Sequence, residues 1–308
     1  MVDKPAADIR IDETLVRALV TSHAARLPQG AAALPLEKVA EGWDSELWRL
    51  GPHLAVRLPR REPAAVLVLN EQRALPGIAT RIAPTGLLVP APLVVGIPSA
   101  QFPWPWSVVP WMEGVSGIDV PREHRAGWAE PLAAALHALH IPAPSDHPVN
   151  PVRGRALSTR DTVFGERLEA LRRAELVDSA TATVLEQIWR RGVTAPIWSA
   201  PAVWIHGDLH PGNLVSRDDA LLGIIDFGDV TAGDPAYDLA VAWLAFDASG
   251  RERFRTAIGT QYDAETWKRA HAWAAAIGVL LLAHSDDAPA YQHAGYEAIA
   301  EVVDDGLD

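Results

Sequence analysis

One polar loop, and the end of the strand that follows it, hold side chains suited to phosphoryl transfer. The loop lies in the segment VWIHGDLHPGNLV and carries Asp208 and, five residues later, Asn213. The next apolar strand, residues 221–225, is followed by Asp226. A carboxylate can orient an attacking hydroxyl and accept its proton, and hard oxygen ligands can hold magnesium against phosphate oxygens. We predict that Asp208 is the base and that Asn213 and Asp226 are the metal ligands.

The flanking elements decide whether these side chains can meet. Apolar residues at 203–205 and 214–215 predict two short strands around the loop. The short connector 217–220 lets the second of these strands pair as a hairpin with the strand that precedes Asp226. Such a hairpin would place the Asp226 carboxylate beside the polar loop.

The order of the remaining elements favours an α+β protein with a small antiparallel-sheet lobe and a larger helical lobe. The stretch from Pro76 to Pro110 is rich in proline, which limits it to loops and short or edge strands, and helical patterns dominate after it. Before it we expect a helix over 12–27, strands over 36–41, 46–50 and 53–58, and a helix over 64–75.

Composition restricts the classes of partner. The chain of 308 residues has 27 basic and 39 acidic residues, a net charge of −12, which argues against nucleic acid and would suit a cationic substrate. It has no cysteine, so disulfides and thiolate metal sites are excluded. The acidic N-terminal segment is unlike a signal peptide, and no apolar run approaches the ~20 residues of a membrane span. We therefore expect a cytoplasmic protein with no membrane partner.

Three segments closely resemble the aminoglycoside phosphotransferase family, the antibiotic kinases of the protein-kinase-like fold. Residues 206–213 resemble its catalytic loop, 225–229 its metal-binding segment and 233–240 the signature that follows. The resemblance covers roughly residues 36–245. It implies a two-lobed fold with an N-terminal nucleotide-binding lobe over 1–110, a hinge over 111–114, and a helical C-terminal lobe over 115–308 that holds the catalytic loop and substrate pocket.

The resemblance also implies roles for individual residues. Asp208 would be the catalytic base, braced by His206, while Asn213 and Asp226 would bind Mg²⁺. Residues 41–48 would form the loop over the phosphates. The phosphoryl donor, ATP or GTP, would be bound by residues of the N-terminal lobe and hinge, namely Arg57, Glu71, Ser45, Trp111 and Met112.

Arg57 departs from the family pattern, which usually has lysine at this position of the third strand. Strand alternation places Arg57 on the small-residue side, facing the cleft, where it would bind the triphosphate and pair with Glu71. Arginine binds phosphate through two donors, but its planar group is bulkier than an ammonium. The other interpretation is that Arg57 joins Arg60 and Arg61 in an exposed basic rim.

The resemblance implies a small-molecule kinase, a nucleoside-triphosphate-dependent O-phosphotransferase. We expect its hydroxyl acceptor to be an aminoglycoside-like antibiotic, with resistance as its role. A macrolide, or a metabolite such as a sugar or amino alcohol, is the alternative, because the loop chemistry is shared and the pocket lies in the diverse helical lobe. The alternative of another class is a nucleotide-binding pseudokinase that serves as an interaction module.

Several polar residues have two interpretations. His206 and His210 are spaced for zinc on a helix, but the glycines and proline around them favour loop bracing. Asp229 faces the substrate or caps a turn, and Asp238 is expected to be a buried acid bonded to the catalytic segment. The acids near the C-terminus would attract an amine-rich antibiotic or form a solvated helix end; they are Glu301, Asp304, Asp305 and Asp308.

Overall fold

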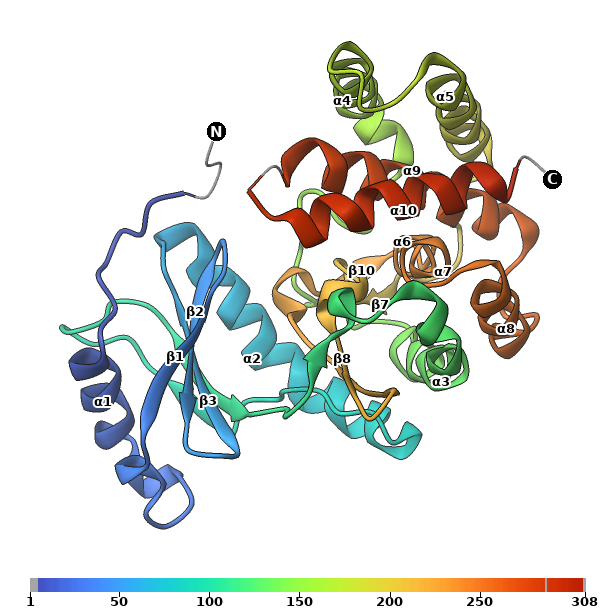
Figure 1. Ribbon diagram of the computed structural model, residues 1–308. Coiled ribbons are helices and arrows are strands. Elements are labelled where there is room, and N and C mark those ends of the chain that lie inside the picture. The colour runs from blue at the N-terminus through green and yellow to red at the C-terminus, as the bar shows by residue number, and fades with distance from the viewer. Residues whose placement is uncertain (1–4, 286, 307–308) are drawn as a thin grey trace.

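An antiparallel sheet forms the N-terminal lobe of the computed structural model, which describes residues 5–285 and 287–306 (Figure 1). The sheet has five strands in the order β1-β2-β3-β5-β4. They are β1 (Leu36–Glu41), β2 (Ser45–Leu50), β3 (Leu54–Pro59), β4 (Val94–Gly96) and β5 (Trp106–Pro110). The first three lie within one residue of their predicted bounds. Their inward side chains pack with Phe102 and Trp106, both fully buried, and with helix α1.

Helix α1 (Glu13–Ser22) begins at Asp12, whose side chain accepts a hydrogen bond from the Leu15 amide at 3.0 Å. The predicted helix over 12–27 is too long, because the chain turns after Ser22 into a short 3-10 segment, Ala24–Arg26. This turn brings the chain back to the edge of the sheet at β1.

Helix α2 (Glu62–Ile82) links the two lobes and continues through Pro76, where the sequence predicted irregular structure. Proline inside a helix costs about 3 kcal/mol. Burial of neighbouring side chains offsets that free-energy cost, because Leu75, Ile78 and Ile82 lie in the core of the C-terminal lobe. Each such side chain contributes about 1.5–3 kcal/mol on burial. Tertiary packing therefore overrides the local preference.

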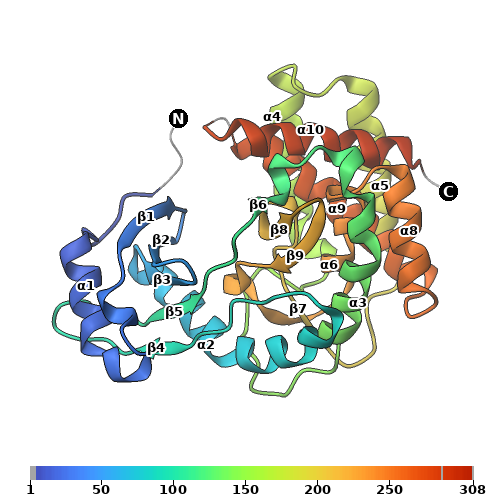
Figure 2. The ribbon, with the colours of Figure 1, turned by 60° about the horizontal axis from the view of Figure 1, so that its bottom comes forward.

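The C-terminal lobe is helical. Its helices are α3 (Ala129–Leu139), α4 (Asp161–Arg173), α5 (Ser179–Thr194), α6 (Ala236–Leu239), α7 (Val241–Leu244), α8 (Ala248–Ile258), α9 (Ala264–His284) and α10 (Pro289–Asp304). The lobe is built around α9, most of whose residues are buried. In Figures 1 and 2, α9 and α10 pack together, with α4 and α5 on one side and α3 and α8 on the other. The predicted arrangement of a small sheet lobe and a larger helical lobe is confirmed.

Two small sheets at the lobe boundary position the polar loop. Strand β7 (Val203–Ile205) pairs with β10 (Thr231–Gly233), and β8 (Leu214–Arg217) pairs with both β6 (Val115–Ser116) and β9 (Ala220–Ile224). The β8–β9 pairing is the predicted hairpin. Within the described residues, no helix has the length and apolar character needed to cross a bilayer.

Candidate active site

A buried carboxylate holds the polar loop against the helical lobe. Asp238 in α6 is fully buried and accepts hydrogen bonds from the amides of His206 at 2.7 Å and Gly207 at 3.0 Å. His140 contacts the same carboxylate at 3.1 Å. A buried charge is tolerated when it is hydrogen-bonded in this way. The predicted contact between Asp238 and the catalytic segment is confirmed, and His140 is an ordinary buried histidine.

His206 braces the loop from inside. Its Nε2–H donates to the carbonyl of Ile225 at 2.9 Å, so Nδ1 is the acceptor for the Asp208 amide at 3.1 Å. The imidazole is fully buried and lies against the ring of Phe227. The side chain therefore positions the backbone of Asp208. Both ring nitrogens of His206 are thus engaged within the site. Among the described residues no group of three or more His, Asp or Glu side chains is placed to hold a metal ion.

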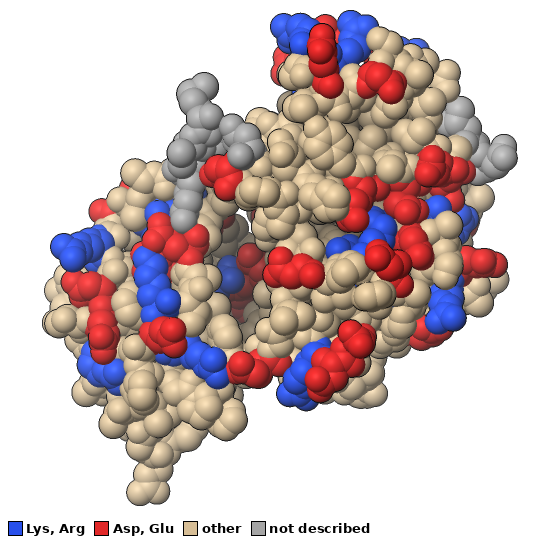
Figure 3. Space-filling view, viewed as in Figure 1, with Lys and Arg blue, Asp and Glu red and all other residues tan. Residues whose placement is uncertain are grey.

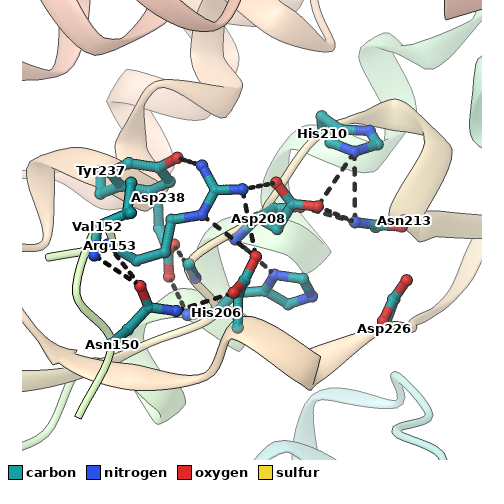
Figure 4. Close-up of polar contacts among 12 residues, drawn as sticks. Asn150, Val152, Arg153, His206, Asp208, His210, Asn213, Asp226, Tyr237 and Asp238 are labelled. Atoms are coloured by element: carbon teal, nitrogen blue, oxygen red, sulfur yellow. Dashed lines mark hydrogen bonds and ion pairs between the residues drawn. The ribbon is translucent and has the colours of Figure 1, made fainter. Parts of the chain in front are cut away.

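The three residues predicted to carry the chemistry converge (Figure 4). The side-chain amide of Asn213 donates to the Asp208 carbonyl at 2.7 Å and to its carboxylate Oδ2 at 3.3 Å. The Asn213 carbonyl accepts from the amide of Ile225 at 2.9 Å, which brings the residue after it, Asp226, to the same place. Asp226 has a left-handed backbone, φ 59°, a region that Asp visits more readily than most residues.

Asn213 and Asp226 fit a magnesium ion. Asn213 uses its amide nitrogen in the loop, which leaves its amide oxygen for a ligand. Asp226 has one carboxylate oxygen, Oδ1, in an ion pair, and the side chain is half exposed toward the space between the lobes. Oxygen donors of these two kinds suit Mg²⁺. Figure 3 shows a deep hollow between the lobes with charged side chains at its floor.

Arg57 connects the two lobes and does not belong to an exposed rim. Its Nε lies 2.9 Å from the Glu71 carboxylate, and its Nη2 lies 2.7 Å from Asp226 Oδ1. Only 18% of the side chain is exposed. Burial by itself would lower the pKa of Arg57, but the charges of Glu71 and Asp226 outweigh burial and raise it. The exposed-rim interpretation of Arg57 is wrong.

Arg60 is also not exposed, contrary to the prediction from the sequence. It is 5% exposed and pairs with Glu41 at 2.8 Å while donating to the carbonyl of Gly42 at 3.1 Å. Arg61 pairs with Asp44. The chain turns directly after β3, so these two arginines point back and fix the turn between β1 and β2 that residues 42–44 form.

The other predicted nucleotide contacts lie at this turn and at the connection between the lobes. The hydroxyl of Ser45 is buried and makes no hydrogen bond to any residue that the structure describes. Trp111 extends the sheet, since its amide donates to the His53 carbonyl at 2.8 Å. The side chain of Met112 is nearly buried and reaches Gly223 of β9, where a Cβ would lie 2.8 Å from its sulfur.

Arg153 enters the site from the loop between α3 and α4, and the sequence did not single it out. Its Nη2 lies 3.0 Å from Asp208 Oδ1 and 3.2 Å from Asp229 Oδ2, and its Nη1 donates to the Tyr237 hydroxyl. Asn150 orients the arginine, because its Oδ1 accepts the Arg153 amide at 2.9 Å while its Nδ2 donates to Asp229 at 2.8 Å. Asp229 is thus an ion-paired member of the site and not a turn cap.

The neighbouring charges set the protonation of the carboxylates. Burial alone would raise the pKa of Asp208, but polar and charge interactions with His210, followed by the charge of Arg153, hold that pKa well below its usual range. Burial also works against ionisation of Asp226, and Arg57 outweighs it, so the pKa is lowered. At Asp229 burial prevails over Arg153 and raises the pKa. Asp208 is therefore ionised, which the predicted role of a base requires.

The acids near the C-terminus stabilise the helical lobe. Arg251 of α8 is buried and pairs with Glu301 at 2.7 Å and Asp305 at 3.1 Å. Asp305 also accepts from the Trp243 indole at 3.0 Å. Asp308 lies outside the described residues. Glu301 and Asp305 are therefore occupied by an internal arginine, which leaves little charge there to attract a cationic antibiotic.

With the fold and site in place, comparison with known proteins assigns the class. The model of the phosphotransferase enzyme family matches residues 35–273, and the chain belongs to that family. Its members include small-molecule kinases, and the protein-kinase-like fold expected from the sequence is confirmed.

Curated relatives are named homoserine kinase. The protein from Gluconacetobacter diazotrophicus is 31% identical over 207 residues, and that from Methylorubrum populi is 33% identical over 160 residues. The first match covers 60% of this chain and 60% of that protein, and the second covers 47% and 44%. The chain thus matches less than two thirds of the length of these relatives.

Solved structures share the fold over nearly the whole chain. The GDP complex of aminoglycoside 2'-phosphotransferase-IIIa has a TM-score of 0.67 at 19% identity, covering 95% of this chain and 98% of that one. Macrolide 2'-phosphotransferase type I has a TM-score of 0.59 at 21% identity, covering 94% and 97%. At such identities the similarity establishes the fold alone.

Proposed function

We propose that the protein transfers the terminal phosphoryl group of ATP or GTP to a hydroxyl of a small metabolite. The convergence of Asp208, Asn213 and Asp226 on one loop and one hairpin is the observation that carries this proposal. Phosphoryl transfer needs a positioned base and neutralised phosphate oxygens, and this set supplies both. An intact set argues against the pseudokinase module, which would have no use for it.

Asp208 would act as the base. Its carboxylate would orient the acceptor hydroxyl and take its proton as the hydroxyl oxygen forms the new bond to phosphorus. The bond from that phosphorus to the bridging oxygen would break, and the nucleoside diphosphate would leave with this oxygen. The low pKa keeps the carboxylate ionised, and contacts to Asn213 and Arg153 fix its direction. The loop itself is held by Asp238 and His206, so the base would need little reorganisation during the reaction.

The nucleotide would occupy the cleft between the lobes. Arg57 would bind phosphate oxygens, with Glu71 keeping its guanidinium in place. The purine ring of the nucleotide would lie near Trp111 and Met112. A magnesium ion held by Asn213 and Asp226 would neutralise the charge on the phosphate oxygens. The donor class is supported by the fold neighbours, whose solved complexes contain GDP, ADP or ATP.

A metabolite acceptor has more support than the aminoglycoside expected from the sequence. The curated relatives are named homoserine kinase. A cavity of about 470 Å³ beside Arg153 is large enough for a small ligand. The only carboxylate among its lining residues, Asp234, pairs with Arg269 at 2.6 Å. A polycation would find no free carboxylate there.

An acceptor panel tests the proposal. Nucleoside diphosphate release would be measured with L-homoserine, kanamycin, erythromycin and simple amino alcohols, each with ATP and with GTP. We expect acceptor-dependent release with a small hydroxylated metabolite and loss of that release in Asp208→Asn. If kanamycin is the only compound that causes release, the acceptor is an antibiotic and not a metabolite. If no compound causes acceptor-dependent release, the proposed kinase activity is refuted.

A further inference from the structure

We propose that three arginines, of which one contacts Asp208 and all line one neighbouring cavity, bind a carboxylate of the acceptor, so that the acceptor is a small hydroxy acid. The arginine cluster consists of Arg153, Arg160 and Arg167. They line one cavity between α4, α6 and α9, together with the aromatic residues Phe164, Tyr237 and Trp273. The inference rests on the proposed function, because it names the acceptor of the same active site.

The arginine cluster lies on the acceptor side of the base. Figure 4 shows Arg153 and Asp226 on opposite sides of Asp208. The metal ligand Asp226 and its partner Arg57 mark the side from which the donor phosphate approaches. Phosphoryl transfer proceeds with the attacking and leaving oxygens roughly in line, so the acceptor must come from the other side. That side is where Arg153 and its cavity lie.

The positive charge of the cluster is only partly compensated. Arg153 is paired with Asp208 and Asp229. Arg160 is half-buried and makes neither an ion pair nor a hydrogen bond with any residue in the described ranges 5–285 and 287–306. Arg167 donates to Nε2 of His284 at 3.2 Å but pairs with no carboxylate in those ranges. Arginines so placed would gain from a bound anion.

The charges around the cavity and its apolar lining both favour a bound carboxylate. Burial lowers the pKa of Arg167, and the charges of Arg160 and Arg153 lower it further, so the three guanidinium groups are close enough to repel one another. The apolar walls, formed by Phe164 and Trp273 among others, reduce the local dielectric constant and strengthen any ion pair made there. No aspartate or glutamate is among the lining residues.

The size of the cavity favours a small anionic group. Its volume is about 40 Å³, far below the roughly 300–1,000 Å³ of pockets that enclose a whole drug-sized ligand. A carboxylate fits this space and a sugar ring does not. The rest of a short hydroxy acid would extend past Arg153 toward Asp208, which would bring its hydroxyl to the base.

Matched acceptors and variants test the inference. The acceptors are L-homoserine, L-serine and glycerate, each compared with the alcohol that lacks the carboxylate, namely 3-aminopropan-1-ol, ethanolamine and ethylene glycol. The variants are Arg160→Ala, Arg167→Ala and the double variant, with Arg167→Lys as the conservative change. Arg173→Ala is the control, because this arginine is on the same helix as Arg167 but its side chain is 72% exposed.

We expect the wild-type protein to prefer the hydroxy acid of one pair. The double variant should raise KM for that acid about tenfold or more, the effect of losing charged hydrogen bonds, with kcat and the KM for nucleotide nearly unchanged. The preference over the matched alcohol should disappear, Arg167→Lys should retain part of it, and Arg173→Ala should behave as wild type. Such a split between KM and kcat is not the signature of a misfolded variant.

Two results would overturn the inference in different ways. If an alcohol, kanamycin or erythromycin is phosphorylated as well as the acids, and the arginine variants do not change the ratio, the kinase proposal stands and the arginine cluster has no role in acceptor binding. If no acceptor is phosphorylated, the proposed function fails. Calorimetric titration of the protein with the three acids would then test the carboxylate site on its own. The site is refuted if none of the acids binds to the wild type, or if the acids bind equally well to the double variant.

Discussion

Arg57 and Asp226 come from different lobes and meet in an ion pair of 2.7 Å across the cleft. Arg57 is on β3, and its Nε pairs with Glu71 of α2, while Asp226 follows β9. The proposed phosphate-binding cation and a proposed metal ligand are thus neighbours. A nucleotide with its metal ion would be bound from both lobes at this point, so that nucleotide binding and the relative position of the lobes are coupled.

Replacing Arg57 tests its proposed contact with phosphate. Arg57→Ala should weaken triphosphate binding by about 1.5–3 kcal/mol, the usual value for a lost charged hydrogen bond, with little effect on nucleoside binding. Arg57→Lys should recover part of the loss, because the charge survives but the two-donor geometry does not. Titration with ATP and with adenosine measures both quantities. Equal weakening of the two ligands, or no weakening, would show that Arg57 serves only in its ion pairs with Glu71 and Asp226.

Replacing Asp208 tests the base. Asp208→Asn keeps the size of the side chain but cannot accept a proton, so turnover should fall about 10²–10⁴-fold while nucleotide affinity stays near that of the wild type. Steady-state rates and nucleotide titration check the two parts. A variant that keeps more than about a tenth of the rate would contradict the assignment, since positioned proton transfer contributes more than that.

Replacing Asp226 tests the metal ligand. Asp226→Ala should remove the gain in nucleotide affinity that magnesium gives, because one of the two proposed oxygen ligands is lost. The measurement is a nucleotide titration with magnesium and with a chelator. Asp304→Ala, at an exposed position at the end of α10, is the control and should keep the full magnesium effect. An unchanged magnesium effect in Asp226→Ala would count against the ligand role.

His271 makes stability depend on pH. Burial lowers its pKa from 6.5 to about 4, its Nε2–H donates to the Val302 carbonyl at 2.9 Å, and its ring stacks on Trp243. Between these two values the unfolded chain binds a proton that the folded chain does not. The free energy of unfolding should therefore fall on acidification through this window, by about 1.4 kcal/mol per pH unit from this group.

Urea unfolding of wild type and His271→Gln over that pH range isolates the contribution. The amide can replace the Nε2–H donor but does not titrate. The difference in unfolding free energy between the two proteins should change with pH below 6.5 and be constant above it. A difference that is constant over the whole range would show that His271 has the same pKa in both states.

The sequence was sufficient where the signal is local. Strands β1 to β3 follow from alternation and glycine breaks, and the loop that carries Asp208 and Asn213 follows from one short segment between apolar residues. The length of α2 could not be predicted, because it depends on burial of Leu75, Ile78 and Ile82 in the other lobe. The exposure predicted for Arg60 was wrong because the turn after β3 reverses its direction.

Arg153 shows the same limit within the site. Its loop has no periodicity and no recognisable motif, and its partners Asp208, Asp229 and Tyr237 are 55 or more residues away in the chain. Only the folded arrangement brings them together. The same holds for Arg160 and Arg167, which no motif or periodicity in the sequence distinguishes from other arginines.

A single-turnover transfer experiment tests the central claim most directly. Excess protein with magnesium would be mixed with ATP or GTP labelled in the terminal phosphate and with each small hydroxylated acceptor, and the products would be identified. The account predicts that with one acceptor the label appears in a phosphate monoester at its hydroxyl, in wild type and not in Asp208→Asn. Binding of the labelled nucleotide with no transfer to any acceptor would contradict it and favour a nucleotide-binding module without kinase activity.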